Sequence, residues 1–336
     1  MIDVTDPSAA LPYPPFDLRQ RVGPDGSTNE EDVARYDELG RSCADHISRI
    51  HPQDWTWEGK RILDFGCGAG RTLRHFLGLP ASTELYGCDL HGGSISWMQV
   101  HLPHRLEVFE NDFQPPLDVP DGHFDLVYAL SVFTHISEGW AGWILEMQRI
   151  LAPGGLLLAT FLGPAMSDWL AGEGLEEEEV GMTCCRNSYL EGNVPTADIL
   201  HSGWWIERHW GPAFTVKEIA NSGFGGPEMG GQDFSGHNSV FQDPAFTPEA
   251  NRSQGWVLLQ RRDVRPGLPE LEEPDWSDPR EIRSLMAGLR VALRDAREAR
   301  RQLQQVTDSR WWRLRTNIDP AVRGVRSVLR TFRDEH

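Results

Sequence analysis

The segment at residues 61–71, RILDFGCGAGR, constrains the fold more than any other part of the chain. Its first half is a short apolar run, typical of a buried parallel strand. Glycines follow at alternate positions, Gly66, Gly68 and Gly70, where the missing Cβ lets the chain turn tightly and lets a ligand lie against the backbone. With the helical pattern at 73–77, this order predicts the first unit of a doubly wound nucleotide-binding sheet. The G-x-G-x-G spacing favours a nucleoside without a pyrophosphate, although an ordinary strand-to-helix turn would show the same pattern.

Polar residues follow two of the strands expected next. Asp89 closes one of them about 20 residues beyond the glycine loop, where a carboxylate can accept hydrogen bonds from two ribose hydroxyls. Asn111 and Asp112 follow another. Because strands and helical patterns alternate, we expect an α/β fold with a parallel sheet, helices on both faces and ligands at the carboxyl ends of the strands. The expected strands after the glycine loop are 84–88, 106–109, 124–130 and 156–161.

Five segments carry a resemblance to a known family. In chain order they are LDFGCGAGR, GCD, NDFQPPL, FDLVYALSVFTHI and RILAPGGLLLATF. Together they resemble class I S-adenosylmethionine-dependent methyltransferases over residues 55–162. The upstream PPFDLRQRVG at 14–23 is similar to the lead-in of one bacterial branch that often accompanies polysaccharide and other envelope-glycan enzymes. The resemblance implies a Rossmann-like sheet, S-adenosylmethionine as cofactor and methyl transfer as the reaction.

The resemblance also implies which residues contact the cofactor. The glycine loop would approach the methionine and ribose parts, braced by the acidic residue before it, and the strand-end Asp89 would hold the ribose hydroxyls. Asp112, together with Asn111, would meet the adenine amino group, and Leu130 would lie near the sulfonium. From the residues alone, a solvated turn carboxylate is an alternative for Asp112 and plain core for Leu130. The complete set is Asp64, Gly66, Cys67, Gly68, Gly70, Asp89, Asn111, Asp112 and Leu130.

A histidine is the candidate catalytic group. A hydroxyl acceptor benefits from a base whose pKa is near neutral, and histidine fits this need. His135 follows the fourth expected strand in SVFTHI, although a capping or packing histidine is the commoner case there. A structural role is favoured more strongly for His201 and His209. We expect no metal site, because the adjacent Cys184 and Cys185 lack the further ligands that zinc needs.

Residues 163–212 form an insert before the strands expected at 213–220 and 256–261. The family places substrate-covering segments at this point. Aromatic rings stack on the apolar faces of sugars, so the tryptophans of the insert predict an acceptor wall, unless they simply pack the insert. No site is expected within 222–255, because this segment cannot be matched residue by residue to the family pattern before the last strand. The tryptophans are Trp169, Trp204, Trp205 and Trp210.

Composition limits the classes of function. The chain has 336 residues, of which 39% are hydrophobic and 24% charged, as in soluble globular proteins. No apolar run approaches the ~20 residues of a membrane span. The N-terminal MIDVTDP lacks the features of a signal peptide, and five cysteines, an odd number, suit a reducing compartment, so we expect a cytoplasmic protein. The net charge is −18, and the acidic catalytic region argues against a nucleic-acid partner.

The C-terminal region differs from the rest. Residues 263–279, with four prolines, predict a linker. Over 280–307, apolar residues recur at steps of three and four, which predicts a coiled coil that binds a second copy or a glycosyltransferase, with a helix docked on the body as the alternative. Residues 280–336 hold 14 arginines and seven acidic residues, a net charge of +7, which leaves −25 on the rest. The heptad positions are Ile282, Leu285, Leu289, Ala292, Ala296, Ala299, Leu303 and Val306.

Residues 308–336 form a basic amphipathic tail. They combine a tryptophan pair with an arginine-ringed helical pattern, which predicts binding to an anionic membrane surface on the cytoplasmic side or to the acidic body. The expected organisation is therefore a lead-in and cap at 1–54, a methyltransferase domain at 55–262, the linker, the coiled coil and this tail. The expected acceptor is a hydroxyl of a sugar or glycan precursor. Another small metabolite, or a cofactor-binding scaffold that recruits glycosyltransferases, is the alternative.

Overall fold

The computed structural model describes residues 11–20, 29–52, 54–190, 194–224 and 254–308. The chain divides into two compact units, 1–288 and 289–336. The sequence expectation for the basic tail at 308–336 falls almost entirely outside the described residues. In the parts that the structure describes, no helix combines the length and the apolar character needed to cross a membrane.

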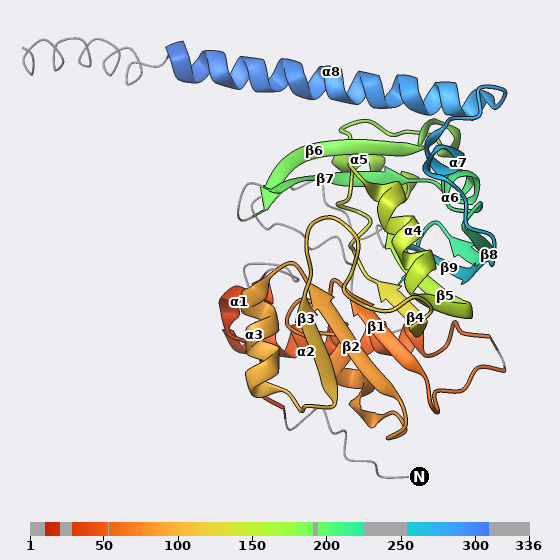
Figure 1. Cartoon of the computed structure of the whole chain (residues 1–336). Coiled ribbons are helices and arrows are strands. Elements are labelled where there is room, and N and C mark those ends of the chain that lie inside the picture. The colour runs from red at the N-terminus through yellow and green to blue at the C-terminus, as the bar shows by residue number, and fades with distance from the viewer. Residues whose placement is uncertain (1–10, 21–28, 53, 191–193, 225–253, 309–336) are drawn as a thin grey trace, which may run out of the picture. The chain divides into compact units, whose positions relative to one another are not determined.

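A seven-stranded sheet forms the centre of the first unit (Figure 1). In chain order its strands are β1 (Arg61–Phe65), β2 (Glu84–Asp89), β3 (Leu106–Glu110), β4 (Phe124–Ala129), β5 (Leu151–Phe161), β8 (Phe214–Ala220) and β9 (Gly255–Arg261). They lie in the order β3-β2-β1-β4-β5-β9-β8. The first five are parallel, and β9 is antiparallel to both neighbours. The expected Rossmann-like sheet is confirmed, and its topology reverses between β1 and β4, where such folds bind ligands.

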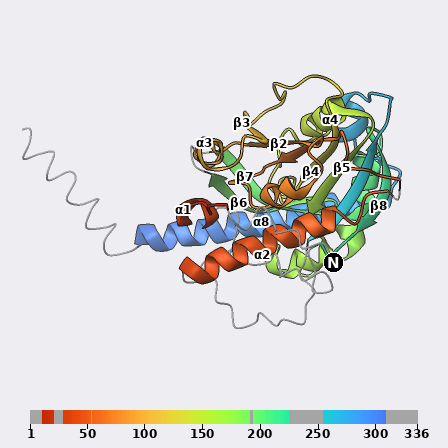
Figure 2. The same ribbon diagram turned by 90° about the horizontal axis from the view of Figure 1, so that it is seen from below.

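Two hydrophobic layers cover the sheet, one on each face. Ile62 and Leu63 show the alternation within β1, because they are both fully buried and belong to different layers. Burial on both faces explains why these strands read as nearly continuous apolar runs. Figure 2 shows α2 on one side of the sheet and α4 on the other. The first layer includes α2 (Asn29–Ile47), the 3₁₀ helix η1 (Leu73–Gly78) and α3 (Gly92–His101); the second includes α4 (Trp140–Ile150) and α6 (Gly203–His209).

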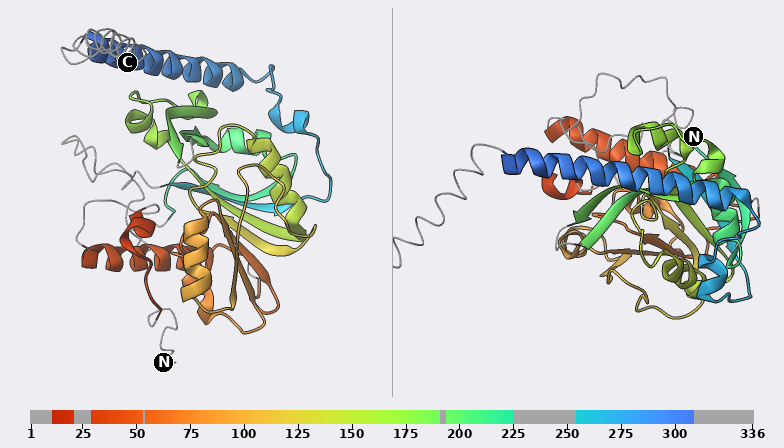
Figure 3. Two further views of the ribbon diagram at one scale, coloured as in Figure 1. Left: turned by 60° about the vertical axis from the view of Figure 1, so that its left-hand side comes forward. Right: turned by 90° about the horizontal axis from the view of Figure 1, so that it is seen from above.

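The insert contains a β-hairpin that the sequence analysis did not predict. Its strands, β6 (Met182–Leu190) and β7 (Val194–His201), form a separate two-stranded sheet (Figure 3). An isolated hairpin is marginal by itself, and here backbone hydrogen bonds attach it to the main sheet. Ile199 N donates to Thr134 O at 2.9 Å, and His201 N donates to Leu162 O at 2.8 Å. The acceptors follow β4 and β5, so the hairpin is fixed at the carboxyl ends of these strands.

The segment at 263–279, expected as a linker, packs onto the first unit. It contains the short helix α7 (Leu268–Glu272), whose Leu271 is fully buried in the second layer. The amide Nε2 of Gln148 lies 3.1 and 2.8 Å from the carbonyl oxygens of Arg262 and Val264. These contacts join residues more than 110 positions apart in the chain, so the proline-rich composition could not indicate them.

The long helix α8 (Pro279–Asp308) follows α7. It covers the 280–307 segment for which a coiled coil was expected, and the helix itself is therefore present. Pairing of this helix with a second chain stays a prediction.

Candidate functional site

The glycine loop after β1 depends on backbone conformations that favour glycine. The φ angles of Gly66, Gly68 and Gly70 are +84°, +53° and +80°. The loop folds over the end of β2, because the N–H groups of Gly66 and Cys67 both donate to Cys88 O, at 2.8 and 2.9 Å. The three glycines therefore shape a tight turn at the carboxyl edge of the sheet.

Asp89 joins this loop to the ends of β2 and β3. Its Oδ2 accepts a hydrogen bond from Gly68 N at 2.8 Å, and its Oδ1 accepts one from His91 N at 2.8 Å. Asn111 N donates to the Asp89 carbonyl oxygen at 3.2 Å. Each carboxylate oxygen has a further lone pair, so this half-buried, oriented group can also accept bonds from a vicinal diol.

Asn111 and Asp112 lie just beyond β3. Asn111 Nδ2 donates to the Asp112 carbonyl oxygen at 2.9 Å, which fixes the turn. The Asp112 side chain is exposed. The structure thus brings Asn111 to the end of β2 and leaves the Asp112 carboxylate at the surface, a placement that both of the sequence interpretations allow.

The segment after β4 forms the opposite side of the site. Leu130 is partly buried and packs against the first hydrophobic layer. Two residues further, Val132 contacts the glycine loop so closely that a Cβ added to Gly66 would collide with its Cγ2. The ends of β1 and β4 therefore meet at the topological switch point.

Ser131 was missed by sequence reasoning. Its φ of +58° is uncommon for a residue other than glycine, and such strain persists where the surroundings enforce it. Ser131 N donates to Thr160 Oγ1 at 2.7 Å, and the buried Gln254 donates from Nε2 to Ser131 Oγ at 3.0 Å. Gln254 lies in the segment where no site was expected. The only sequence signal was a glutamine directly before the last strand.

The N-terminal cap touches the glycine loop from another side. Tyr36 on α2 is buried and donates from its hydroxyl to Ala69 O at 3.3 Å. Gly40 on the same helix lies against the Arg71 carbonyl, so that a Cβ there would collide with this oxygen. The Arg74 guanidinium is fully buried and lies 4.2 Å from the centre of the Tyr13 ring. The cap and the loop thus form one packed structure.

Asp64, at the end of β1, is buried beneath the loop. Burial raises the pKa of Asp64 to about 8, and the nearby Asp89 carboxylate acts in the same direction. The carboxyl is therefore mostly protonated at neutral pH without a ligand. Burial likewise raises the pKa of the Cys67 thiol well above its usual value, so Cys67 is a packing group and not a thiolate nucleophile.

The free energy of unfolding should depend on pH through Asp64. Its folded pKa of about 8 exceeds the ordinary value of 3.8, so the folded chain holds this proton more tightly than the unfolded chain. The stabilisation is complete below 3.8 and is lost as the pH rises toward about 8. Urea denaturation should show this decline, and Asp64→Asn should flatten it. Exposed Asp118→Asn is the control, and an unchanged pH profile in Asp64→Asn would contradict the assignment.

His135 lies between the β4 end and the hairpin. Its Nδ1 is 3.0 Å from the Ala197 carbonyl oxygen and 3.6 Å from Asp198 Oδ1. Because a carbonyl oxygen only accepts, Nδ1 carries the proton, and in the neutral ring Nε2 holds the lone pair. The side chain remains 35% exposed. His135 therefore has a tautomer suited to accept a proton at Nε2.

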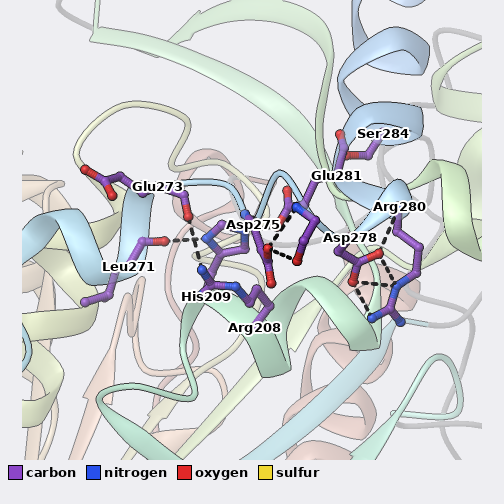
Figure 4. A network of polar contacts seen from close by, with 10 residues as sticks. Arg208, His209, Leu271, Glu273, Asp275, Asp278, Arg280, Glu281 and Ser284 are labelled. Carbon is purple, nitrogen blue, oxygen red and sulfur yellow. Dashed lines mark hydrogen bonds and ion pairs between the residues drawn. The ribbon is translucent and has the colours of Figure 1, made fainter.

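The two other candidate histidines have structural roles. His201 is buried beside Trp205 and Trp210, and burial lowers its pKa to about 3. His209 Nε2 is 3.1 Å from Glu281 Oε1, and its Nδ1 contacts the Leu271 carbonyl (Figure 4). Both nitrogens thus face acceptors within the packed region that joins α6, α7 and the start of α8.

Most tryptophans of the insert belong to the core. Trp204, Trp205 and Trp210 are between 1% and 7% exposed and lie in the second hydrophobic layer. Trp204 Nε1 donates to the Glu177 carbonyl oxygen at 3.0 Å. These three therefore pack the insert, and only Trp169, which is partly buried, remains for an acceptor wall. Across the described ranges, no three side chains of the metal-binding types gather closely enough to hold a metal ion.

Comparison with known proteins agrees with this geometry. Residues 62–155 match the methyltransferase domain family. Residues 62–155 are a class I methyltransferase domain. Its cofactor is S-adenosylmethionine, and Asp89 fits this ligand because it presents an oriented carboxylate suited to a ribose diol.

The relatives of this methyltransferase domain differ in what they methylate. The fatty-acid O-methyltransferase of Mycolicibacterium smegmatis is 32% identical over 32% of this chain and 39% of its own length. The phthiotriol/phenolphthiotriol dimycocerosates methyltransferase 1 of Mycobacterium ulcerans is 29% identical over 46% and 60%. This chain thus spans less than two thirds of either relative. A solved S-adenosylmethionine-dependent methyltransferase from Mesorhizobium loti is 16% identical with a TM-score of 0.41, covering 64% of this chain and 95% of that one.

Proposed function

We propose that this protein transfers the methyl group of S-adenosylmethionine to a hydroxyl oxygen of a small acceptor, with His135 as the base. The sulfonium methyl is already electrophilic when the cofactor is bound. The protein must then position the acceptor in line and remove a proton from its hydroxyl. The observation that carries the proposal is the orientation of His135, whose Nδ1 lies 3.0 Å from the Ala197 carbonyl oxygen, so that the neutral ring bears its basic lone pair on Nε2.

His135 belongs to the chain segment that adjoins the glycine loop. It follows Leu130 by five residues, and Val132 between them contacts the glycine loop. We further propose that Asp198, 3.6 Å from His135 Nδ1, positions the ring and stabilises the imidazolium that forms. In this arrangement, β7 of the hairpin supplies the two residues that hold the His135 ring. The hairpin lies at the carboxyl ends of β4 and β5.

The acceptor class that we propose to test first is a sugar or glycan precursor. Support for it is the resemblance of the lead-in at 14–23. The burial of three insert tryptophans removes most of the stacking argument. Similar proteins include the fatty-acid O-methyltransferase named above and a ubiquinone biosynthesis O-methyltransferase of Cereibacter sphaeroides. Transfer of labelled methyl from S-adenosylmethionine to sugar nucleotides, a fatty acid and a quinol would separate these acceptors. Methylation of the fatty acid or quinol alone would exclude the glycan proposal.

The base is tested by the pH dependence of turnover on whichever acceptor is methylated. His135→Ala should lower turnover by about 100-fold or more at neutral pH, and part of the loss should be recovered at high pH, where the acceptor ionises without help. Asp198→Asn should have a smaller effect in the same direction. Exposed His104→Ala is the matched control. A loss that is the same at every pH would show that His135 positions or packs and does not accept the proton.

A further inference from the structure

Helix α8 presents two different faces. One is packed in the first unit: Glu281 is 3% exposed and contacts His209, and Ser284 lies against Gly181. Ala287, one turn further, is fully buried. Figure 4 shows Glu281 and Ser284 at the start of the helix, with His209 facing Glu281. The sequence alternative of a helix docked on the body is therefore realised there, on a face other than the predicted heptad.

The heptad face is apolar and exposed. A single exposed leucine needs no explanation, but a stripe of seven large apolar side chains along one helix does. From 282 to 306 the stripe is about 37 Å long at 1.5 Å per residue. It contains no charged residue at the core heptad positions. Its members, 46% to 64% exposed, are Ile282, Leu285, Met286, Leu289, Leu293, Leu303 and Val306.

We propose that this stripe binds α8 of a second copy of the chain, in a parallel and in-register pair. The repeat alternates in steps of three and four, which suits a two-stranded coiled coil. Self-pairing buries the apolar stripes of both copies at once, because an isologous interface uses the same surface on each copy. The choice of a second copy and of its direction rests on charge complementarity at the flanks of the stripe.

Two flanking charges favour the parallel pair. With the apolar residues at the core positions, Asp295 occupies a g position and Arg300 the following e position, five residues later. In a parallel pair, the g residue of one helix lies beside the following e residue of the other helix. Asp295 of each copy would therefore pair with Arg300 of the other copy, which gives two ion pairs. In an antiparallel pair centred on the stripe, Asp295 would face its own counterpart, which is unfavourable.

The remaining arginines agree with this arrangement. Arg283, Arg290 and Arg297 occupy b positions, and Arg294 and Arg301 occupy f positions, so they all lie outside the seam. Three alanines in the middle of the seam bury little area, so we expect a dimer that dissociates on dilution. A parallel pair brings the first units of the two copies to the same end of the coiled coil. The proposal does not depend on which acceptor is methylated.

Sedimentation velocity of the full chain over a range of concentrations tests the pairing. The parent protein should form a dimer, and Leu289→Glu combined with Leu303→Glu should raise the dimer dissociation constant by at least about 100-fold. Val100→Glu, which changes a 76% exposed side chain on α3, is the matched control and should leave the dimer intact. A parent protein that stays monomeric at high micromolar concentration, or a dimer that the double variant does not weaken, would overturn the proposal.

Charge reversal and cross-linking test the direction. Asp295→Arg should weaken the dimer, and adding Arg300→Asp should restore it. In a Cys184→Ser background, which removes an exposed thiol, oxidation of Val306→Cys should form a disulfide between position 306 of one copy and position 306 of the other. Preferential cross-linking of Val306→Cys to Ile282→Cys in mixed samples would instead show an antiparallel pair and overturn the direction. Monomers that bind anionic vesicles through the stripe would overturn self-pairing in favour of a membrane surface.

Discussion

Replacing Asp89 by alanine is expected to weaken the binding of S-adenosylmethionine by at least about 100-fold. A hydrogen bond to a charged group contributes about 1.5 to 3 kcal/mol, and two ribose hydroxyls would lose their acceptor together. The substitution also leaves the N–H groups of Gly68 and His91 without the carboxylate that now orients them, at 2.8 Å each. Calorimetric titration of the purified protein measures the change directly.

Two further variants make this result specific. Asp89→Asn keeps one carbonyl acceptor and should fall between the parent and Asp89→Ala. Asp118→Ala removes an exposed carboxylate elsewhere and should bind normally. Circular dichroism should show that all three variants are folded. A folded Asp89→Ala protein with unchanged affinity would exclude Asp89 as the ribose ligand.

Replacing Gly66 by alanine should damage both stability and cofactor binding. The φ of +84° costs an L-residue about 1 to 2 kcal/mol, and the added methyl group would push Val132 away at a further cost of about 1 to 3 kcal/mol. We expect the free energy of unfolding to fall by about 3 kcal/mol. We expect affinity for S-adenosylmethionine to fall more than about tenfold, because the ends of β1 and β4 would separate.

Gly59 provides the matched control. Its φ is +68°, but an added Cβ there would meet nothing within 4 Å. Gly59→Ala should therefore show only the cost of the backbone conformation, about 1 kcal/mol, and should bind the cofactor normally. Urea denaturation and calorimetry on both variants separate the two contributions. Equal losses in both proteins would mean that contact with Val132 has no part in the effect.

Local patterns were sufficient to predict the part of the sheet that carries the expected cofactor site. The alternation of apolar strands and helices predicted the parallel part of the sheet, and the glycine spacing with a strand-end Asp89 predicted a loop and a carboxylate for one ligand. The hydrogen bond between Gly68 and Asp89 was not predicted. These features are encoded within about 100 consecutive residues, from the start of β1 to the end of β5, and parallel strands necessarily bring their carboxyl ends to one edge. The role proposed for each of these residues in cofactor binding is still a prediction, which the Asp89 and Gly66 variants test.

Long-range side-chain contacts set the limit of prediction. Ser131 and Gln254 are 123 positions apart, and no periodicity indicates that an amide will support a strained serine beside the site. The contacts of Gln148 with the backbone of 262–264 likewise turn an expected linker into a packed segment. Such bonds depend on where the folded chain places one amide, so neither composition nor spacing contains them.

Local sequence patterns predicted the Rossmann-like sheet, the glycine loop and the heptad of α8. Apolar runs alternating with helical patterns indicated the sheet, alternate glycines indicated the loop, and steps of three and four residues indicated the heptad. Contacts within the folded chain set which face of α8 packs and which remains exposed. The buried contact between His209 and Glu281, 72 positions apart, fixes the rotation of the helix about its axis at its first turn. A repeat defines a face relative to its own helix, whereas the direction of that face depends on contacts with the rest of the fold.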